Sequence, residues 1–235
     1  MIRIEGVTVQ FGGVRPLNGL TAEFTDPICG LIGPNGAGKT TLLNVLSGFV
    51  APICGRILLD DIDLSPLTPQ GRFRAGLRRS FQTEQVVDDL NVWDNLMAAF
   101  DNLVGTTVPP AAQISKALHY TGLAARANTL GSALNLFERR MVEIGKALIG
   151  TPRAILLDEP GAGMNEGESA KLRKILLGIS SSFGAQVLLI DHDVDLIQAT
   201  CSQTLVLDFG EKLALGPTAD VLRDKAVRNA YLGVA

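Results

Sequence analysis

The sequence contains few cysteines, and none of them are spaced as a pair. Cys29, Cys54 and Cys201 lie far apart, and no CxxC pattern occurs. This excludes a disulfide framework and a cysteine-based zinc site, because both need several cysteines at characteristic spacings. So few cysteines are typical of a protein that works in a reducing cytoplasm.

Long apolar runs and blocks of basic residues are also absent from the sequence. No run of about 18 apolar residues could form a transmembrane helix. Residues 1–10 alternate as a strand does, instead of forming a basic stretch and an apolar signal core. No basic block is longer than a doublet, such as Arg78-Arg79 or Arg139-Arg140, and the formal net charge is -3. We therefore expect a cytoplasmic protein whose main partner is not nucleic acid.

What the sequence does contain is a series of short apolar strands separated by helical stretches. With 235 residues, of which 46% are hydrophobic, the chain is long enough to bury a core as a single domain, 1–235. Residues 29–32, 154–158, 187–191 and 204–207 are continuous runs rich in Ile, Leu and Val. Such strands are typical of a buried, mainly parallel sheet, so we predict an α/β fold.

The segment 82–150 has a different pattern. Strand patterns disappear, and apolar residues recur at helical spacing, as Val92 and Leu96 do. We therefore predict an α-helical subdomain, 82–150, inserted between the two parts of an α/β core, 1–81 and 151–235. Residues 104–112 are rich in Gly, Pro and Thr, and we expect an exposed loop there because the prolines prevent a continuous helix.

Residues 33–40 read GPNGAGKT and match the phosphate-binding pattern GxxxxGK[ST] at every position. The motif follows the predicted strand 29–32 and precedes a helical run, 40–46. In this setting backbone N–H groups and a helix N-terminus bind phosphate. A chance glycine-rich turn is the alternative, but the strand and helix on either side argue against it.

The motif defines a set of residues expected to bind ATP or GTP. Lys39 is predicted to reach the β- and γ-phosphates, and Thr40 to bind Mg²⁺ through its hydroxyl. The predicted nucleotide-binding residues are Gly33, Pro34, Asn35, Gly36, Ala37, Gly38, Lys39, Thr40 and Thr41.

Two adjacent carboxylates, Asp158 and Glu159, end the predicted strand 154–158. Ligands of α/β proteins bind at this edge of the sheet. We predict that Asp158 holds Mg²⁺ through its water shell and that Glu159 orients the water that attacks the γ-phosphate. The alternative is a solvated acidic strand end before Pro160, which the phosphate-binding motif disfavours.

A histidine, His192, follows the predicted strand 187–191. It could hydrogen-bond the γ-phosphate and the attacking water. A lone histidine is more often structural, but its place at the same sheet edge favours the catalytic role. The other histidine, His119, lies in a helical stretch and is interpreted as structural.

Taken together, these motifs resemble those of the ATP-binding-cassette ATPases, in the same order along the chain. The resemblance implies a P-loop NTPase core with a mainly parallel sheet, an N-terminal antiparallel β portion and an inserted helical subdomain. It also implies that Phe11, which precedes Gly12-Gly13, stacks on adenine. Gln82, in Phe81-Gln82-Thr83, would sense Mg²⁺ and the γ-phosphate and take part in catalysis with Lys39.

The same resemblance implies where partner proteins bind. The helical subdomain of the family receives a helix from a membrane permease, so residues 83–95 are expected at that partner. Trp93 could touch the permease, but it is equally well explained as a core anchor.

Several stretches are similar to the branched-chain amino-acid importer type of this family. They are FGGVRPL from Phe11, LSGF from Leu46, RRSFQ from Arg78, EPGAGMN from Glu159, LLIDHDVDLI from Leu188 and AYLG from Ala230. The similarity implies an ATPase subunit on the cytoplasmic face of the membrane. It would work with two transmembrane permease subunits and, indirectly, with a solute-binding protein.

The chain departs from the family at the signature motif, LSGGQ. Alignment places the motif at residues 134–138, which read LNLFE, so the leucine alone is kept. In the family, this segment offers a serine hydroxyl and glycine N–H groups to ATP held by the other subunit. Here Phe137 is bulky and Glu138 adds negative charge, which should weaken the site. We therefore expect a heterodimer with a cassette that has an intact signature, although tolerated drift is an alternative.

Three alternatives to an importer subunit stay open at this point. The degenerate signature is compatible with a regulatory subunit that binds ATP without hydrolysing it. A cassette that drives lipid or drug export differs from an importer cassette only through the motifs quoted above. A soluble cassette protein of translation or DNA repair usually has two cassettes or a long coiled-coil insertion, and this sequence has neither.

Overall fold

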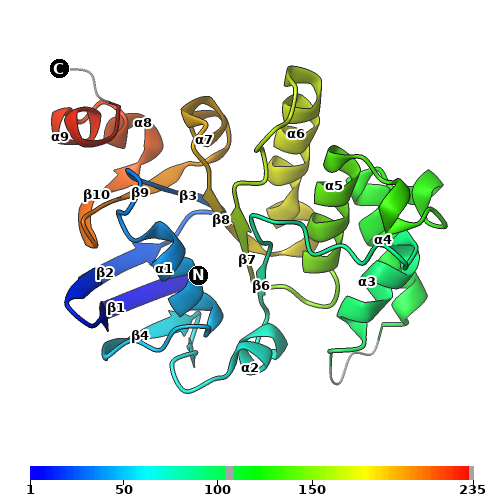
Figure 1. The fold of residues 1–235 in the computed structure, drawn as a ribbon, viewed down its shortest axis with the longest axis horizontal. Helices are drawn as coiled ribbons and strands as arrows, with labels where there is room; N and C mark the ends of the chain where they lie inside the picture. Colours follow the sequence, from blue (N-terminus) through cyan, green and yellow to red (C-terminus); the bar gives the residue numbers. More distant parts are fainter. Residues whose placement is uncertain (104–107, 233–235) are drawn as a thin grey trace.

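The predicted parallel strands form one six-stranded sheet, and an antiparallel sheet lies beside it (Figure 1). The computed structural model describes residues 1–103 and 108–232. The larger sheet has the order β10-β9-β3-β8-β7-β6; neighbours from β9 to β6 are parallel, and β10 pairs antiparallel with β9. Its strands are β3 (Ile28–Ile32), β6 (Leu77–Arg79), β7 (Ala154–Asp158), β8 (Gln186–Ile190), β9 (Gln203–Asp208) and β10 (Glu211–Pro217).

All four runs predicted as strands lie in this sheet, and the α/β prediction is confirmed. Every residue of β3, β7 and β8 is buried, as expected for strands that are covered on both faces. The predicted strand 187–191 is wrong by one residue at each end. β8 ends at Ile190, and Asp191 begins the loop that leads to the next helix.

The N-terminal part of the chain forms the antiparallel sheet, in the order β2-β1-β4-β5. Helix α1 (Lys39–Ser47) packs in a hydrophobic cluster with this sheet and one face of the larger sheet, to which Leu42, Leu156 and Leu188 contribute. The strands of the antiparallel sheet are β1 (Ile2–Phe11), β2 (Val14–Phe24), β4 (Cys54–Leu59) and β5 (Ile62–Asp63).

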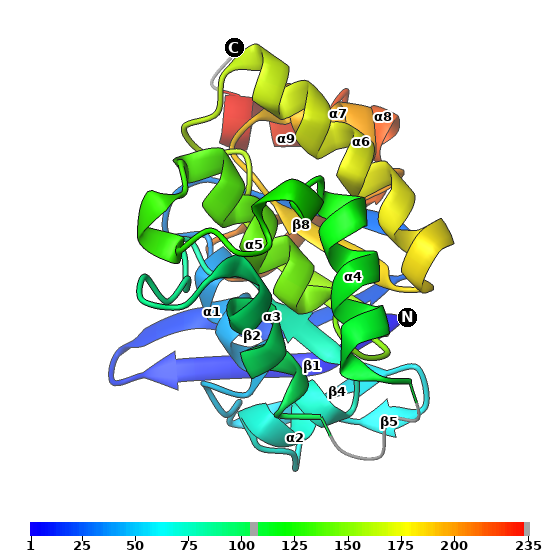
Figure 2. The ribbon, with the colours of Figure 1, turned by 90° about the vertical axis from the view of Figure 1, so that its right-hand side faces the viewer.

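The other face of the larger sheet is covered by helices (Figure 2). Because successive strand residues point to opposite faces, Leu157 and Leu189 belong to this second cluster. Val92 and Leu96, predicted at helical spacing, are buried there, as are Ile114 and Met141. The main helices of this face are α3 (Val92–Phe100), α4 (Pro110–Thr121), α5 (Leu136–Ala147) and α6 (Glu166–Phe183).

The predicted loop 104–112 is wrong at its end. Residues 104–107 lie outside the described residues, but α4 already begins at Pro110. Proline is accepted in the first turn of a helix, because the N–H that it lacks has no acceptor inside the helix there.

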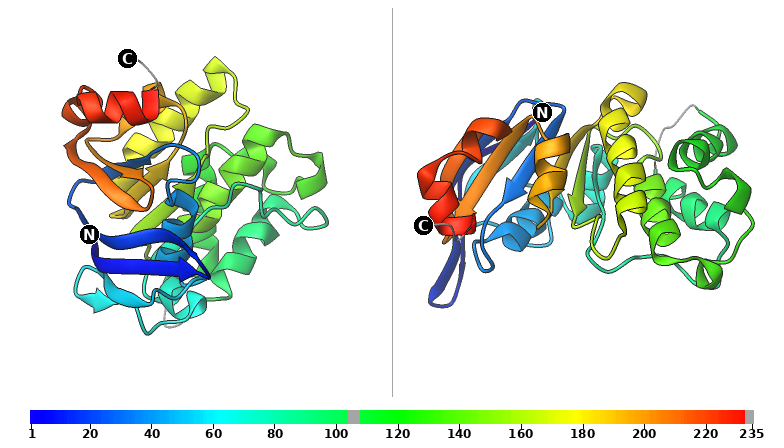
Figure 3. Two further views of the ribbon diagram at one scale, coloured as in Figure 1. Left: turned by 60° about the vertical axis from the view of Figure 1, so that its left-hand side comes forward. Right: turned by 90° about the horizontal axis from the view of Figure 1, so that it is seen from above.

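The remaining helices are short and lie mainly at the edges of the molecule. Seen from above, α8 and α9 lie at the opposite end of the molecule from α3, α4 and α5 (Figure 3). Within 1–103 and 108–232, no helix is both long enough and apolar enough to cross a membrane. These elements are α2 (Pro69–Arg74), α7 (Val194–Thr200), α8 (Thr218–Val221), α9 (Lys225–Val227), and the single turns Ala124–Arg126, Gly131–Ala133 and Arg228–Leu232.

Candidate active site

The loop 33–38 joins β3 to α1 and is packed so tightly that two of its glycines have no room for a side chain. A Cβ on Gly33 would lie 2.2 Å from the carbonyl oxygen of Leu207, and one on Gly38 would lie 2.3 Å from that of Pro16. Both glycines also have positive φ angles, +151° and +103°. Only glycine allows this backbone to approach β9 and β2 so closely.

The first turn of α1 is open to an anion. Its N-cap is Gly38, and no described side chain caps it, so the first amide groups keep their partial positive charge. Lys39 Nζ folds back over the loop and donates to the carbonyl oxygens of Gly33, at 2.5 Å, and Pro34, at 2.9 Å. Burial lowers the pKa of Lys39, while Glu159 and Asp158 act in the opposite direction. With Thr40 exposed in the same turn, these donors fit a triphosphate.

Asp158 is buried at the end of β7, and an arginine that the sequence did not single out pairs with it. Its Oδ2 lies 3.4 Å from Nη2 of Arg79, the last residue of β6. Burial raises the pKa of Asp158, and Arg79 opposes that rise. The sequence offered one indirect signal for Arg79, the stretch RRSFQ.

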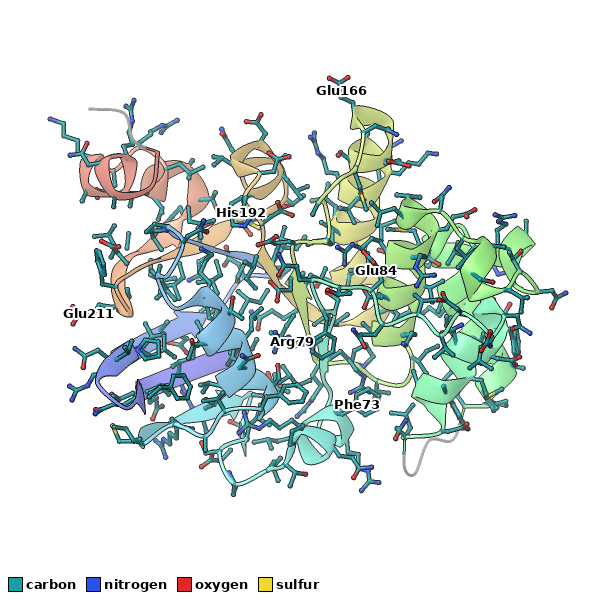
Figure 4. The ribbon with its side chains drawn as sticks, viewed as in Figure 1. Phe73, Arg79, Glu84, Glu166, His192 and Glu211 are labelled. Atoms are coloured by element: carbon teal, nitrogen blue, oxygen red, sulfur yellow. The ribbon has the colours of Figure 1, made fainter. Side chains whose placement is uncertain are left out.

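Glu159 contacts two other predicted catalytic residues, His192 and Gln82. Its Oε1 lies 2.5 Å from Nε2 of His192, and Gln82 Nε2 donates to its Oε2 at 3.1 Å. The side chain of Glu159 is 15% exposed and that of His192 is 52% exposed, so the carboxylate is sheltered while the imidazole (labelled in Figure 4) reaches solvent. A carboxylate held in this way could orient and polarise a water molecule.

The backbone at Glu159 is unusual for a residue with a side chain. Its φ is +50°, in the left-handed region, and its amide donates to the carbonyl oxygen of Ile190 at 2.7 Å. Such a conformation costs about 1 kcal/mol or more and persists where the surroundings hold it. The two adjacent carboxylates have different partners: Asp158 pairs with Arg79, and Glu159 contacts Gln82 and His192.

Asp191 is a second residue whose role the sequence did not reveal. It is buried, and its carboxylate accepts from the amides of Gly161, at 3.3 Å, and Asp193, at 3.0 Å. Burial raises its pKa. Asp191 therefore ties the loop that carries His192 to the loop that follows Glu159.

Phe11, the predicted adenine-stacking residue, lies at the end of β1. It faces Val14 across the turn into β2, and the residue is 54% exposed. The ring is therefore accessible to a planar ligand, as stacking would require.

A family model described as ABC transporter matches residues 23–162, which is more than half of the chain. The chain belongs to the ABC transporter family. The predicted family and enzyme class are confirmed: the cassette belongs to the ABC transporter ATPases, a family in which ATP hydrolysis is coupled to transport.

Curated relatives of the cassette include ATP-binding proteins of branched-chain amino acid transport and of lipopolysaccharide export. It is 33% identical to the high-affinity branched-chain amino acid transport ATP-binding protein LivG of Escherichia coli K12, over 100% of this chain and 98% of the relative. It is 32% identical, with the same coverage, to BraF of Pseudomonas aeruginosa, which carries the same description. It is also 36% identical to the lipopolysaccharide export system ATP-binding protein LptB of Escherichia coli K12, over 88% of this chain and 86% of the relative.

Solved structures of ABC cassettes share its fold. The ADP conformation of MJ1267, an ATP-binding cassette of an ABC transporter, matches with a TM-score of 0.88 and 26% identity, over 100% of this chain and 99% of the other. A nucleotide-free cassette matches with the same TM-score and identity.

Residues 134–138, which align with the signature motif, lie at the start of α5. Asn135 caps the helix by accepting from the Glu138 amide at 2.8 Å, and Glu138 Oε2 accepts from the Asn135 amide at 3.0 Å. This reciprocal capping box occupies amides at the helix N-terminus with the protein's own side chains. The first turns of α1 and α5 therefore differ: α1 offers free amides to an anion, and α5 has its own caps.

The charge of Glu138 is also paired, which the sequence did not reveal. Arg126 Nε and Nη2 donate to its two carboxylate oxygens at 2.8 and 3.0 Å. Phe137 packs against the helical core, and Leu136 is exposed. The expected negative charge is therefore present, but it is bound by Arg126 and by the Asn135 amide.

Proposed function

We propose that this cassette hydrolyses ATP as one half of a heterodimer in an importer of branched-chain amino acids or a related small organic solute. The partner cassette would have an intact signature, and two permease subunits would hold both cassettes on the cytoplasmic face of the membrane. The main support for this proposal is the contrast between the uncapped first turn of α1 and the capped first turn of α5.

The half of the site that this chain contributes has the groups that the reaction needs. Lys39 and the amides of loop 33–38 would bind the phosphates of ATP, and Phe11 would stack on the adenine. Thr40, Gln82 and Asp158 would hold Mg²⁺, which neutralises the β- and γ-phosphates when bound. Glu159 would polarise the attacking water, and its contacts with Gln82 and His192 keep its carboxylate in place.

The half that α5 would contribute to the opposite site lacks the serine and the glycines of an intact signature. A helix N-terminus binds an anion through unoccupied amides, and in α5 the amides of Asn135 and Glu138 are already bonded to each other's side chains. The exposed Leu136 further opposes close approach of a phosphate, while Phe137 packs against the helical core. A homodimer would have two weak sites, whereas a heterodimer would have one complete site.

The importer assignment rests on relatives and on motifs together. The curated importer subunits LivG and BraF align with the whole of this chain, whereas the export subunit LptB aligns with 88% of it. The stretches FGGVRPL and EPGAGMN, similar to the branched-chain importer type, support the same choice. A solute-binding protein would supply the cargo to the permease.

A cavity beside the helical segment supports the proposed contact with the permease. Its volume is about 510 Å³, and its lining includes Phe73 of α2, Phe81, Ala98 of α3 and Ala147 of α5. In this proposal 82–150 is the helical subdomain that meets the permease, and 1–81 with 151–235 is the nucleotide-binding core. Gln85 is the residue of the predicted contact stretch 83–95 in this lining, and the half-buried Trp93 packs in the helical core, which favours its role as an anchor.

The test is the Glu159→Gln variant in the purified transporter, with Glu166→Gln as the matched control. Glu166 is an exposed glutamate at the start of α6, so its loss should leave ATPase activity unchanged. We expect Glu159→Gln to lower the ATPase rate by about 100-fold or more while ATP still binds. An unchanged rate would assign this chain the regulatory role instead, since the regulatory alternative predicts binding without turnover.

A further inference from the structure

The guanidinium of Arg79 lies among three segments: the end of β7 at Asp158, residues 44–49, and Phe81. It lies 3.4 Å from Asp158 Oδ2 and donates from Nη1 to Asn44 Oδ1, at 2.7 Å, and to Ser47 Oγ, at 3.3 Å, both on α1. Its carbon Cζ is 4.9 Å from the centre of the Phe81 ring and 6.0 Å from that of Phe49. The side chain is 9% exposed, so these contacts replace water around a full positive charge.

The two rings connect Arg79 with the cavity beside the helical segment. Phe49 and Phe81 meet edge to face with ring centres 6.0 Å apart, and Phe49 is 58% exposed. Arg79 and Phe81 line both the 510 Å³ cavity and a smaller one of about 190 Å³, which Phe49 also lines. A group that fills either cavity therefore contacts Arg79 or one of the rings against which it packs.

We propose that Arg79 is a positioning residue through which the occupant of this cavity, a permease segment, acts on Asp158. The inference rests on the proposed function for the identity of the occupant. A segment that presses on Phe49 and Phe81 would shift the guanidinium. Asp158 has this guanidinium as its ion-pair partner. A small displacement of the guanidinium therefore changes how strongly the Asp158 carboxylate can bind the metal. The hydrogen bonds to Asn44 and Ser47 transmit the same displacement to α1, whose first turn holds Lys39.

The neighbouring Arg78 provides a matched control. It is more deeply buried than Arg79 and lines the same two cavities, but its guanidinium lies 3.8 Å from the centre of the Phe73 ring and donates to the carbonyl oxygens of Phe73 and Ile149. It makes no described contact with Asp158. Figure 4 labels Arg79 and Phe73, which lie on adjacent elements, β6 and α2.

The test measures the affinity of the metal site for Mn²⁺ in the absence of ATP hydrolysis. Mn²⁺ is titrated by electron paramagnetic resonance into the cassette with a non-hydrolysable ATP analogue, alone and assembled with its permease. In the wild type, assembly should change the Mn²⁺ affinity by at least threefold. In Arg79→Lys this difference should disappear, because a lysine keeps the charge but cannot make the forked contacts. Arg78→Lys should keep the difference.

Phe49→Ala gives a second, independent arm in case Arg79→Lys does not fold. Phe49 is largely exposed, so its loss should leave the Mn²⁺ affinity of the isolated cassette unchanged within twofold and abolish the effect of assembly. A difference that persists in both Arg79→Lys and Phe49→Ala overturns the inference. Failure of the wild-type cassette to bind the analogue or the permease would instead overturn the proposed function.

Discussion

Asn135 and Glu138 cap each other across the first turn of α5, each accepting a hydrogen bond from the other's amide. The same turn in an intact signature must leave its amides and hydroxyl to the ATP of the opposite subunit. In this cassette the amides of Asn135 and Glu138 are occupied by the helix's own side chains, and Leu136 and Phe137 stand where an intact signature has glycines.

The capping box should therefore affect stability and not activity. Asn135→Ala is expected to lower the free energy of unfolding by about 1 kcal/mol, because the Glu138 amide loses its acceptor. The ATPase rate of the assembled transporter should not change. Asn165→Ala, in the corresponding capping box of α6, is the control for stability. A rate that falls tenfold in Asn135→Ala alone would mean that α5 does contact nucleotide.

The ion pair between Glu138 and Arg126 should give stability that depends on pH. Hydrogen bonding from Arg126 is the main cause that lowers the pKa of Glu138 below its ordinary value of 4.5. A lowered carboxylate pKa stabilises the folded state above the unfolded pKa, and this gain is lost as pH falls through the folded value. Glu138→Gln should thus be less stable than the wild type at neutral pH, and the difference should shrink in acid.

Urea unfolding of the wild type and Glu138→Gln over a series of pH values measures this difference. Arg126→Gln should show the same pH dependence, since it removes the other partner of the pair. A stability difference that stays constant as pH falls would rule out the ion pair as its source.

Gln82 and His192 should act on the rate of hydrolysis and not on ATP binding. Both contact the Glu159 carboxylate, so Gln82→Ala and His192→Ala are expected to lower kcat by about 10- to 100-fold. The KM for ATP should change less than threefold. His119→Ala, an exposed histidine on α4, is the control and should behave as the wild type. A KM that rises with an unchanged kcat would assign these residues to binding.

The glycines of loop 33–38 should not tolerate substitution equally. Gly38→Ala places a Cβ 2.3 Å from the Pro16 carbonyl oxygen, so the loop cannot form and nucleotide affinity should fall at least 100-fold. Gly36→Ala meets open space, and its φ of +81° should cost only about 1 kcal/mol. Binding of a fluorescent ATP analogue compares the two variants. Equal losses in both would mean that the close approach to β2 does not matter.

The features that the sequence predicted well are local ones. GPNGAGKT and the carboxylates at the end of β7 are contiguous patterns, and the structure of each depends mainly on residues that are close together in the sequence. What it missed depends on residues far apart in the chain: Arg79 and Asp158 are separated by 79 positions, and Asp191 and Gly161 by 30. The hydrophobic periodicity of a sequence does not indicate which distant residues pair. Even the pairing of Arg126 with Glu138, 12 positions later, cannot be predicted without the fold. The early start of α4 was missed because prolines were taken as breakers and not as a first turn.

The most direct test of unequal sites is the ATPase rate of this cassette alone and with an intact-signature partner cassette. Alone, the rate should stay near background at every protein concentration, because each site of a homodimer would include the self-capped α5. With the partner, the rate should rise by about 100-fold or more, and Glu159→Gln in this chain should remove the gain. A cassette that hydrolyses ATP as fast alone as with its partner would contradict the account.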